Sequence, residues 1–209
     1  MPDARPILIT VFEPFGGATL NASFLVGNAL TADEPNVELL RLPVVAGLAE
    51  AILCKRLDAD PPPRLIVSLG EAGGQNSVRL EQVAINYDHF RIPDNDENQP
   101  RDQTINPYGP AAYFATVPAA RIVESLNGRT PTPVVLSLSA GAFVCNHVAY
   151  RALEYLADGK LCPYLFVHVP AWRERGDLIL EDIVETVRAV VGEADRLAPR
   201  VDTPPHGNV

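Results

Sequence analysis

The chain has 209 residues, and its 17 basic and 26 acidic side chains give it a formal net charge of −9. Such an acidic protein is a poor partner for nucleic acid, because binding to the phosphate backbone needs clustered lysine and arginine. With 47% apolar and 21% charged residues, the composition is typical of a globular protein and excludes a wholly disordered chain. At roughly 150 residues per domain, the length predicts a single domain over residues 1–209, with a frayed tail from about residue 199.

The cysteines and the N-terminal residues bear on cellular location. The three cysteines, Cys54, Cys145 and Cys162, lack the number and spacing of a disulfide framework or a metal site. The chain does not begin with the long apolar segment and cleavage site of a secretory signal. No apolar run approaches the ~18 residues needed to cross a bilayer. We therefore expect a cytoplasmic protein with reduced thiols that uses no metal, no cofactor and no membrane partner.

Short apolar runs alternate along the chain with segments in which apolar residues recur at helical spacing. In chain order, we expect a strand at 6–11, a helix from Asn21 or Ser23 to Thr31, a strand at 37–42, a helix at 45–57, strands at 64–69 and 78–87, a helix at 119–126, a strand at 134–138, a helix at 145–156, a strand at 164–169 and a helix at 178–191. This order predicts an α/β protein, a three-layer α/β/α sandwich around a central, mostly parallel, twisted sheet. Sites in such proteins lie at the carboxyl ends of the strands.

Residues 88–110 form a long stretch with little apolar periodicity and several asparagines and prolines. A loop of about twenty residues inside a compact domain is uncommon, and is more often functional or mobile than incidental. We expect this loop to be a lid, an interface or both.

Cys145 lies between a predicted strand and the start of a predicted helix. A thiolate at a helix N-terminus is stabilised by unpaired N–H groups and by the positive end of the helix dipole. The same N–H groups can stabilise an oxyanion on an attacked carbonyl. The alternative is a buried structural cysteine, which is how we interpret Cys54 and Cys162.

His168 stands near the end of the last predicted strand, where it can act as a general base for a thiol. The alternative is a core histidine whose hydrogen bonds are satisfied. His147 is a rival base, but positions i and i+2 diverge by about 200° around a helix, so it is poorly placed to pair with Cys145.

Glu81 lies within the strand predicted at 78–87, on the face that carries Val83 and Ile85. If that face meets the core, the carboxylate is partly buried and needs a partner, and orienting a histidine is one such role. The alternative is a surface carboxylate on an edge strand. Glu13, in the turn after the first strand, is a competing candidate.

Glycines and aromatic residues follow several of the predicted strands. Gly70 and the pairs at 16–17 and 73–74 allow close approach of the backbone to a ligand, but neither nucleotide-binding fingerprint, GxxxxGK[ST] or GxGxxG, is present. Phe12 and Phe15 are either a hydrophobic cover for the core or the walls of a small apolar pocket.

Further short motifs run along the chain from residue 7 to about residue 171. They comprise residues 12–17 with Asn21, 72–74, Glu81 with 83–86, 91–95, 98–100, 109–114, 140–141, 143–147 and 168–170. Together they resemble the pyroglutamyl peptidase I family, also called pyrrolidone-carboxylate peptidases, which are cysteine peptidases.

The resemblance implies a phosphorylase/hydrolase-like α/β/α fold and an activity that removes an N-terminal pyroglutamyl residue from peptides. It implies Cys145 as nucleophile, His168 as general base and then acid, and Glu81 as the group that orients the imidazole. It also implies a homo-oligomer, a dimer or a tetramer. The residues that it implies for substrate binding are Phe12, Phe15, Asn21, Glu71, Arg91, Phe143 and Val144.

Three positions depart from the family pattern: Val11 replaces a usual glycine, Ala142 a usual threonine, and Glu71 a frequent glutamine or leucine. A carboxylate at 71 that faced the pocket could repel the substrate carbonyl or raise a neighbouring pKa. One alternative is therefore a weakly active or inactive homologue that binds lactams. A second is a phosphorylase-like enzyme that uses the glycine turns to bind an oxyanion such as phosphate.

Overall fold

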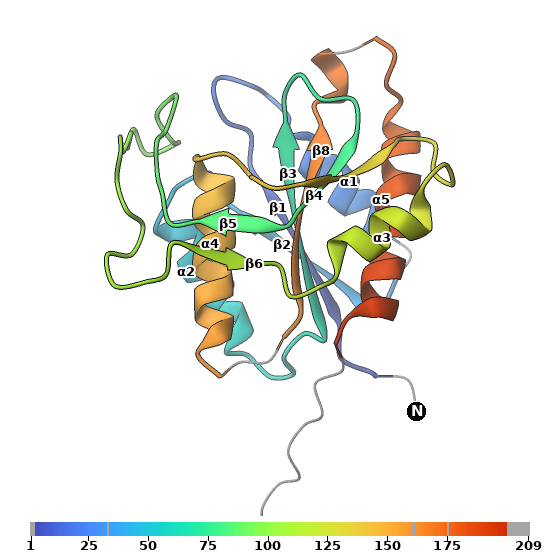
Figure 1. Ribbon diagram of the computed structural model, residues 1–209. Coiled ribbons are helices and arrows are strands. Elements are labelled where there is room, and N and C mark those ends of the chain that lie inside the picture. The colour runs from blue at the N-terminus through green and yellow to red at the C-terminus, as the bar shows by residue number, and fades with distance from the viewer. Residues whose placement is uncertain (1–2, 33, 160–161, 175, 200–209) are drawn as a thin grey trace, which may run out of the picture.

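The computed structural model describes residues 3–32, 34–159, 162–174 and 176–199 (Figure 1). The tail that we expected to fray lies, from residue 200 on, outside the described residues.

A six-stranded sheet in the order β2-β1-β3-β8-β4-β7 forms the middle layer. Its strands are β1 (Ile7–Phe12), β2 (Val37–Leu42), β3 (Leu65–Ala72), β4 (Val78–Glu81), β7 (Val134–Ser137) and β8 (Tyr164–Pro170). Strands β2, β1, β3 and β8 run parallel, whereas β4 pairs antiparallel with β8 and parallel with β7. The sheet is therefore mostly parallel, as predicted.

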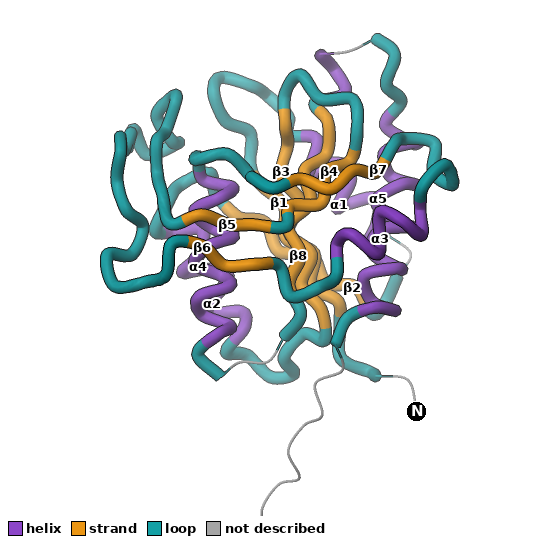
Figure 2. The backbone as a smooth tube through the Cα atoms, viewed as in Figure 1, coloured by secondary structure: helices purple, strands orange, loops and turns teal. Residues whose placement is uncertain are grey.

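Helices cover both faces of the sheet (Figures 1 and 2). The core on one face includes side chains of α1 (Ala22–Thr31), α3 (Ala119–Leu126) and α5 (Leu180–Leu197), and the core on the other face those of α2 (Leu48–Leu57) and α4 (Val144–Ala157). A 3₁₀ turn, η1 (Trp172–Glu174), follows β8. This arrangement confirms the three-layer sandwich, although α2 begins later and α5 ends later than the periodicity predicted.

Strand β8 is buried on both faces, because its side chains alternate between the two hydrophobic cores. Leu165, Val167 and Val169 belong to the core beneath α1, α3 and α5, whereas Tyr164 and Phe166 belong to the core beneath α2 and α4. Because side chains alternate along a strand, His168 points to the α4 side.

The strand predicted at 78–87 is divided in the structure. β4 ends at Glu81, and β5 (Val83–Ile85) leaves the main sheet to pair with β6 (Ala112–Phe114), a strand that the sequence analysis missed. The prediction that Glu81 shares a face with Val83 and Ile85 was therefore wrong. The buried side chain of Asn146 on α4 holds β5 in place, since it accepts a hydrogen bond from Ile85 N–H and donates one to Ile85 C=O, both at 2.9 Å.

The loop at 88–110 connects β5 to β6 and folds back on itself. Asp88 and Gln103 exchange backbone hydrogen bonds of 2.7 and 3.0 Å. The buried Asp94 carboxylate accepts from the backbone N–H groups of Asp96 and Asn98, each at 2.9 Å. These contacts give the loop a defined course without helix or strand.

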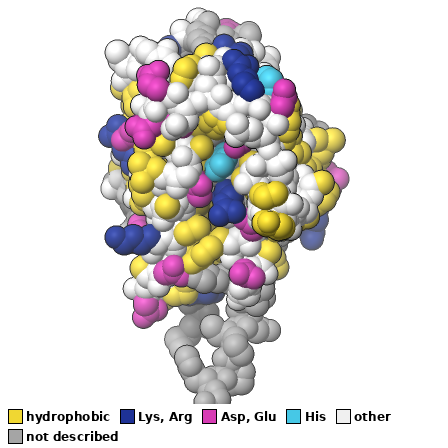
Figure 3. Space-filling view, turned by 90° about the vertical axis from the view of Figure 1, so that its left-hand side faces the viewer, with side chains coloured by type: hydrophobic (Ala, Val, Ile, Leu, Met, Phe, Trp, Pro, Cys, Tyr) yellow, Lys and Arg dark blue, Asp and Glu magenta, His cyan; other side chains and the backbone are white. Residues whose placement is uncertain are grey.

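No helix among the described residues combines the length and the apolar character needed to span a membrane. On the face shown in Figure 3, basic side chains stand singly among acidic and hydrophobic ones.

Candidate active site

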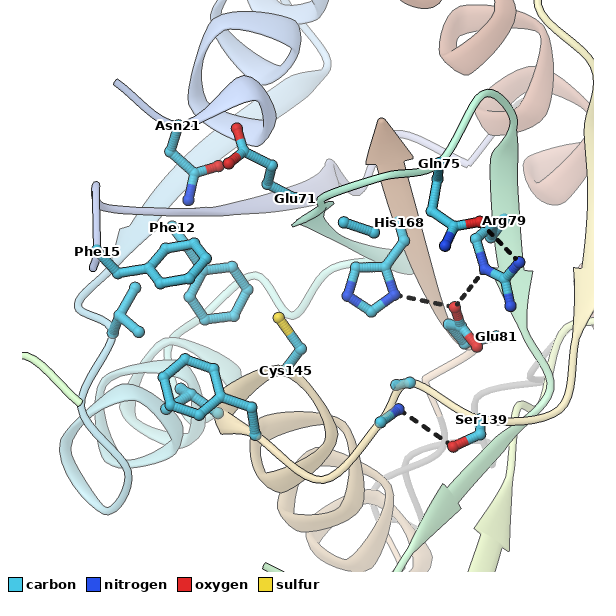
Figure 4. A pocket seen from close by; sticks show the side chains of 16 residues that line it. Phe12, Phe15, Asn21, Glu71, Gln75, Arg79, Glu81, Ser139, Cys145 and His168 are labelled. Carbon is cyan, nitrogen blue, oxygen red and sulfur yellow. Dashed lines mark hydrogen bonds and ion pairs between the residues drawn. The ribbon is translucent and has the colours of Figure 1, made fainter. Parts of the chain in front are cut away.

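The carboxyl ends of β1, β3 and β8 and the N-terminus of α4 surround a cavity of about 280 Å³ (Figure 4). The residues that line it are Phe12, Phe15, Asn21, Val44, Glu71, Ala72, Gln75, Arg79, Glu81, Ser139, Ala140, Gly141, Phe143, Val144, Cys145 and His168. Nine of the ten predicted site residues are in this set, and only Arg91 is not.

Cys145 is the second residue of α4, where backbone N–H groups have no intrahelical acceptor. Its sulfur passes over Gly70 of β3, and a Cβ atom added at Gly70 would lie 3.0 Å from Sγ and 2.9 Å from the Phe166 ring. Glycine at position 70 therefore makes room for the thiol between the helix and the sheet.

His168 lies between β3 and β4, opposite Gly70 on one side and Arg79 on the other. Its Nδ1 is 2.9 Å from Oε1 of Glu81, and both side chains are buried. Burial by itself would lower the pKa of His168, but hydrogen bonds to Cys145 and Glu81 outweigh it and raise that pKa to about 9. At neutral pH the imidazole is therefore protonated and places a positive charge beside the thiol.

Aromatic side chains form the other end of the cavity. The Phe15 ring lies 5.8 Å from the Phe143 ring, and Phe90 packs edge-on against Phe143 at 4.7 Å. Phe12 and Val144 are buried in the same wall. This end suits a small, neutral, flat group.

Asn21 and Glu71 meet at the N-terminus of α1. Asn21, one of the two predicted N-cap candidates, caps the helix by accepting from Ser23 N–H at 2.9 Å, and Ala22 N–H donates to Glu71 Oε2 at 2.5 Å. The Glu71 carboxylate is thus held at the positive end of a helix dipole, which offsets its charge.

Two other predicted candidates lie away from the cavity walls. Arg91 is exposed on the long loop, and its backbone oxygen accepts a hydrogen bond from Gln99 at 3.0 Å. Glu13 forms an ion pair of 3.5 Å with Arg41, so it does not compete with Glu81 for His168.

His147 points into a different buried cluster, as its divergence from Cys145 predicted. Its Nδ1 lies 2.7 Å from Asp88 Oδ2 and its Nε2 lies 3.1 Å from Glu50 Oε1. Burial opposes protonation, but the two carboxylates raise the pKa of His147 to about 9. A protonated His147 therefore joins α4 to α2 and to the start of the long loop.

Cys162 lies far from this arrangement. Its thiol donates to Pro63 C=O at 3.2 Å, and burial raises its pKa to about 12, which suits a packing residue. Among the described residues, no group of three His, Cys, Asp or Glu side chains is arranged to hold a metal ion.

The sequence analysis missed several lining residues, and Arg79 is the one with a charge. Its Nε lies 3.8 Å from Glu81 Oε1, and its other nitrogens donate to Ser137 Oγ at 2.8 Å and to Gln75 Oε1 at 3.3 Å. A signal was present, because Arg79 stands two residues before Glu81 and alternate residues of a strand share a face.

An α/β sandwich that joins a thiol at a helix N-terminus to a buried imidazole and a carboxylate has the site architecture of a cysteine peptidase. The comparisons with known proteins agree with this class. The family model described as pyroglutamyl peptidase matches residues 5–191, and the chain belongs to that family.

Relatives and solved structures are similar over most of the chain. A pyrrolidone-carboxylate peptidase 2 of Photorhabdus laumondii is 38% identical over 93% of each chain, and a pyrrolidone-carboxylate peptidase of Klebsiella pneumoniae is 42% identical over 78% of this chain and 77% of its own. The crystal structure of Bacillus amyloliquefaciens pyroglutamyl peptidase I superposes with a TM-score of 0.84 at 32% identity, covering 92% of this chain and 97% of that one. A mutant pyrrolidone carboxyl peptidase from Pyrococcus furiosus gives a TM-score of 0.81 at 31% identity, covering 90% and 97%.

The close packing at Gly70 predicts the effect of one added methyl group. In Gly70→Ala we expect the methyl to displace Sγ or the Phe166 ring, which lowers the free energy of unfolding by about 1–3 kcal/mol. Because Sγ loses its place beside His168, alkylation of Cys145 by iodoacetamide should slow on the order of tenfold. Urea unfolding and the labelling rate, followed by mass spectrometry, measure both effects.

Gly192→Ala is the matched control, since a Cβ at Gly192 in α5 meets nothing within 4 Å. It should label at the wild-type rate and gain about 0.5–1 kcal/mol of stability. Wild-type labelling of Gly70→Ala would contradict the steric interpretation.

The His147 cluster predicts a loss of stability at alkaline pH. Its folded pKa of about 9 exceeds the unfolded value of 6.5, so its contribution is complete below pH 6.5 and is lost as pH rises through 9. Between pH 6 and 9.5, the wild type should lose about 2–3 kcal/mol more unfolding free energy than His147→Gln. Urea unfolding of both proteins at the two pH values tests this, and parallel losses would show that His147 does not titrate in this way.

Proposed function

We propose that this chain is a pyroglutamyl peptidase that removes the N-terminal pyroglutamyl residue from peptides, with Cys145, His168 and Glu81 as its catalytic residues. One observation carries the proposal. The Cys145 thiol is hydrogen-bonded to a buried, carboxylate-held His168, at the boundary between an aromatic wall and a polar wall of one cavity. The names of the relatives, pyrrolidone-carboxylate peptidases, support the same activity.

The acylation step follows from the position of Cys145. The thiolate, stabilised by the imidazolium of His168, attacks the carbonyl that links the pyroglutamyl ring to the next residue. Backbone N–H groups in the first turn of α4, at Val144 and Cys145, have no intrahelical acceptor and can donate to the resulting oxyanion.

His168 then moves the protons. When the tetrahedral intermediate collapses, the C–N bond breaks and His168 gives its proton to the leaving amine, which leaves a thioester on Cys145. Water next attacks the thioester and transfers a proton to the now neutral His168, which releases pyroglutamate and restores the thiolate and imidazolium. Throughout, Glu81 holds the Nδ1 side of the ring and so aims the other nitrogen at the reacting atoms.

The two ends of the cavity fit the two parts of the substrate. Phe12, Phe15 and Phe143 contact the flat, neutral lactam, which carries no charge that would need a partner. Glu71 is engaged by Ala22 N–H at the α1 N-terminus, so its charge is offset before substrate arrives. This favours a working peptidase over a homologue that only binds lactams.

Turnover of a fluorogenic pyroglutamyl amide, beside an alanyl amide, tests this proposal. We expect hydrolysis of the pyroglutamyl compound only, and its loss after treatment with iodoacetamide. Cys145→Ala should fold as the wild type does and lose at least about 10³-fold in turnover, because it removes the thiol that forms the acyl intermediate.

Cys162→Ala is the control, because its thiol lies outside the cavity, and it should keep wild-type turnover. Activity that survives Cys145→Ala, or that persists after alkylation, would rule out the nucleophile. Binding of pyroglutamate without turnover of any pyroglutamyl amide would favour the lactam-binding alternative.

We also propose a cytoplasmic protein that assembles as a homo-oligomer, a dimer or a tetramer. Cys145 and Cys162 form no disulfide, which suits a reducing compartment. Leu136 and Leu138 are exposed on and just after β7, an edge strand of the main sheet, and offer an apolar surface for a second copy. Sedimentation velocity should give two or four times the 22.6 kDa chain mass, and a monomer at micromolar concentration would contradict the assembly.

A further inference from the structure

We propose that Arg79 is a positioning residue for this reaction, the permanent positive charge that holds the Glu81 carboxylate toward His168 and balances it when His168 gives up its proton. The proposal rests on the proposed function, since it concerns the proton transfers of that reaction. It assigns a role to a residue that touches the catalytic carboxylate but need not touch the substrate.

Strand pairing places the three side chains together. Arg79 lies directly opposite His168 across the antiparallel β4–β8 pair, and Glu81 follows two residues later on the same face of β4. The guanidinium reaches Glu81 with Nε at 3.8 Å from Oε1, the oxygen that also meets His168 Nδ1. Figure 4 shows Arg79 and His168 on either side of this carboxylate.

The head group of Arg79 is held so that it cannot easily swing away. Nη2 donates to Ser137 Oγ at 2.8 Å on the neighbouring strand β7, and Nη1 donates to Gln75 Oε1 at 3.3 Å. The Arg79 side chain is 31% exposed, whereas that of Glu81 is only 2% exposed. A fixed cation therefore faces a carboxylate that solvent scarcely reaches.

The contact with His168 compensates only part of the Glu81 carboxylate, so the cation at Arg79 is also needed. Its Oε2 is buried and has no hydrogen-bond partner, so only Oε1 is compensated. A buried carboxylate without a partner is costly, and the cost rises if its cationic neighbour becomes neutral.

The charges in the site change during one turnover, and Arg79 matters most in the acyl-enzyme. In the resting site, the Cys145 thiolate and Glu81 balance the His168 imidazolium and Arg79. In the acyl-enzyme, the thioester and His168 are both neutral, and only Arg79 remains to balance Glu81. Without Arg79, acylation would leave a lone buried carboxylate beside the imidazole, so His168 would release its proton less readily.

The other ionisable groups that line the cavity do not take over this role. From β3, the Glu71 carboxyl group is engaged with Ala22 N–H and supplies no cation, and from α4, Cys145 is the nucleophile. From β4 come Glu81 and Arg79 themselves. Among the described residues that line the cavity, the permanent cation is Arg79.

The test compares Arg79→Met with Arg79→Lys and Gln75→Ala, using an uncharged fluorogenic pyroglutamyl amide. For Arg79→Met we expect kcat to fall about tenfold with KM within about twofold, because the substrate ring binds at the other end of the cavity. The pH dependence of kcat should shift upward by about one unit, since loss of a nearby cation favours the protonated imidazole. Arg79→Lys keeps the charge and should recover most of kcat and the wild-type pH profile.

Gln75→Ala removes a contact of Arg79 but no charge, so it should keep the wild-type pH profile. NMR titration of the His168 imidazole, assigned with His168→Gln, gives a second reading that needs no turnover. There we expect a midpoint about one unit higher in Arg79→Met than in the wild type. Thermal unfolding of each variant shows that it folds.

The outcomes separate this inference from the proposed function. Equal kcat, equal pH profiles and equal His168 midpoints in wild type and Arg79→Met would overturn the role of Arg79 while the peptidase activity stands. Arg79→Lys as impaired as Arg79→Met would also overturn it, because shape and not charge would then be required. If the wild type hydrolyses no pyroglutamyl amide, the proposed function fails, and the NMR midpoints alone decide whether Arg79 acts on His168.

Discussion

The hydrogen bond between His168 and Glu81 is the contact around which the site is built. It crosses from β8 to β4, the one pair in the main sheet that runs antiparallel, and it is buried on the α4 side of the sheet. The antiparallel register sets Arg79 opposite His168 and Glu81 opposite Phe166. The Glu81 carboxylate therefore lies diagonally across from His168 on the face of the sheet that α4 covers.

The buried imidazoles of His147 and His168 have similarly raised pKa values, but their different surroundings give them different roles. His147 has a carboxylate at each ring nitrogen, so both N–H groups of the imidazolium are engaged within the protein, and these contacts stabilise the packing of α4. His168 has a carboxylate at Nδ1 only and a thiol as its other partner, and it lines a cavity that a substrate can enter. A raised pKa does not by itself mark a catalytic histidine; the partner of the second nitrogen and access to a cavity decide.

Two carboxylates line the cavity, and each is compensated before substrate binds. Glu71 is offset by the N-terminus of α1, and Glu81 by His168 and Arg79. The aromatic walls of the cavity carry no charge, so a neutral lactam displaces little bound charge. Although the protein as a whole is acidic, the charge beside the Cys145 thiol is the imidazolium of His168.

The sequence by itself determined the alternation of strands and helices, the start of a helix near Asn21 or Ser23, the place of Cys145 at a helix start and of His168 at a strand end, and the family motifs. These depend on local periodicity and on residues near one another in the chain, which patterns can report. The end of β4 at Glu81, the pairing of β5 with β6 and the contact of Arg79 with Glu81 were decided only by the tertiary structure. The alternation of apolar and polar residues continues through Gln82 and does not indicate that one strand ends there and another begins, because both sheets bury the same kinds of side chain. Which carboxylate meets which imidazole depends on strand order and register between segments 87 residues apart, and no local pattern encodes that.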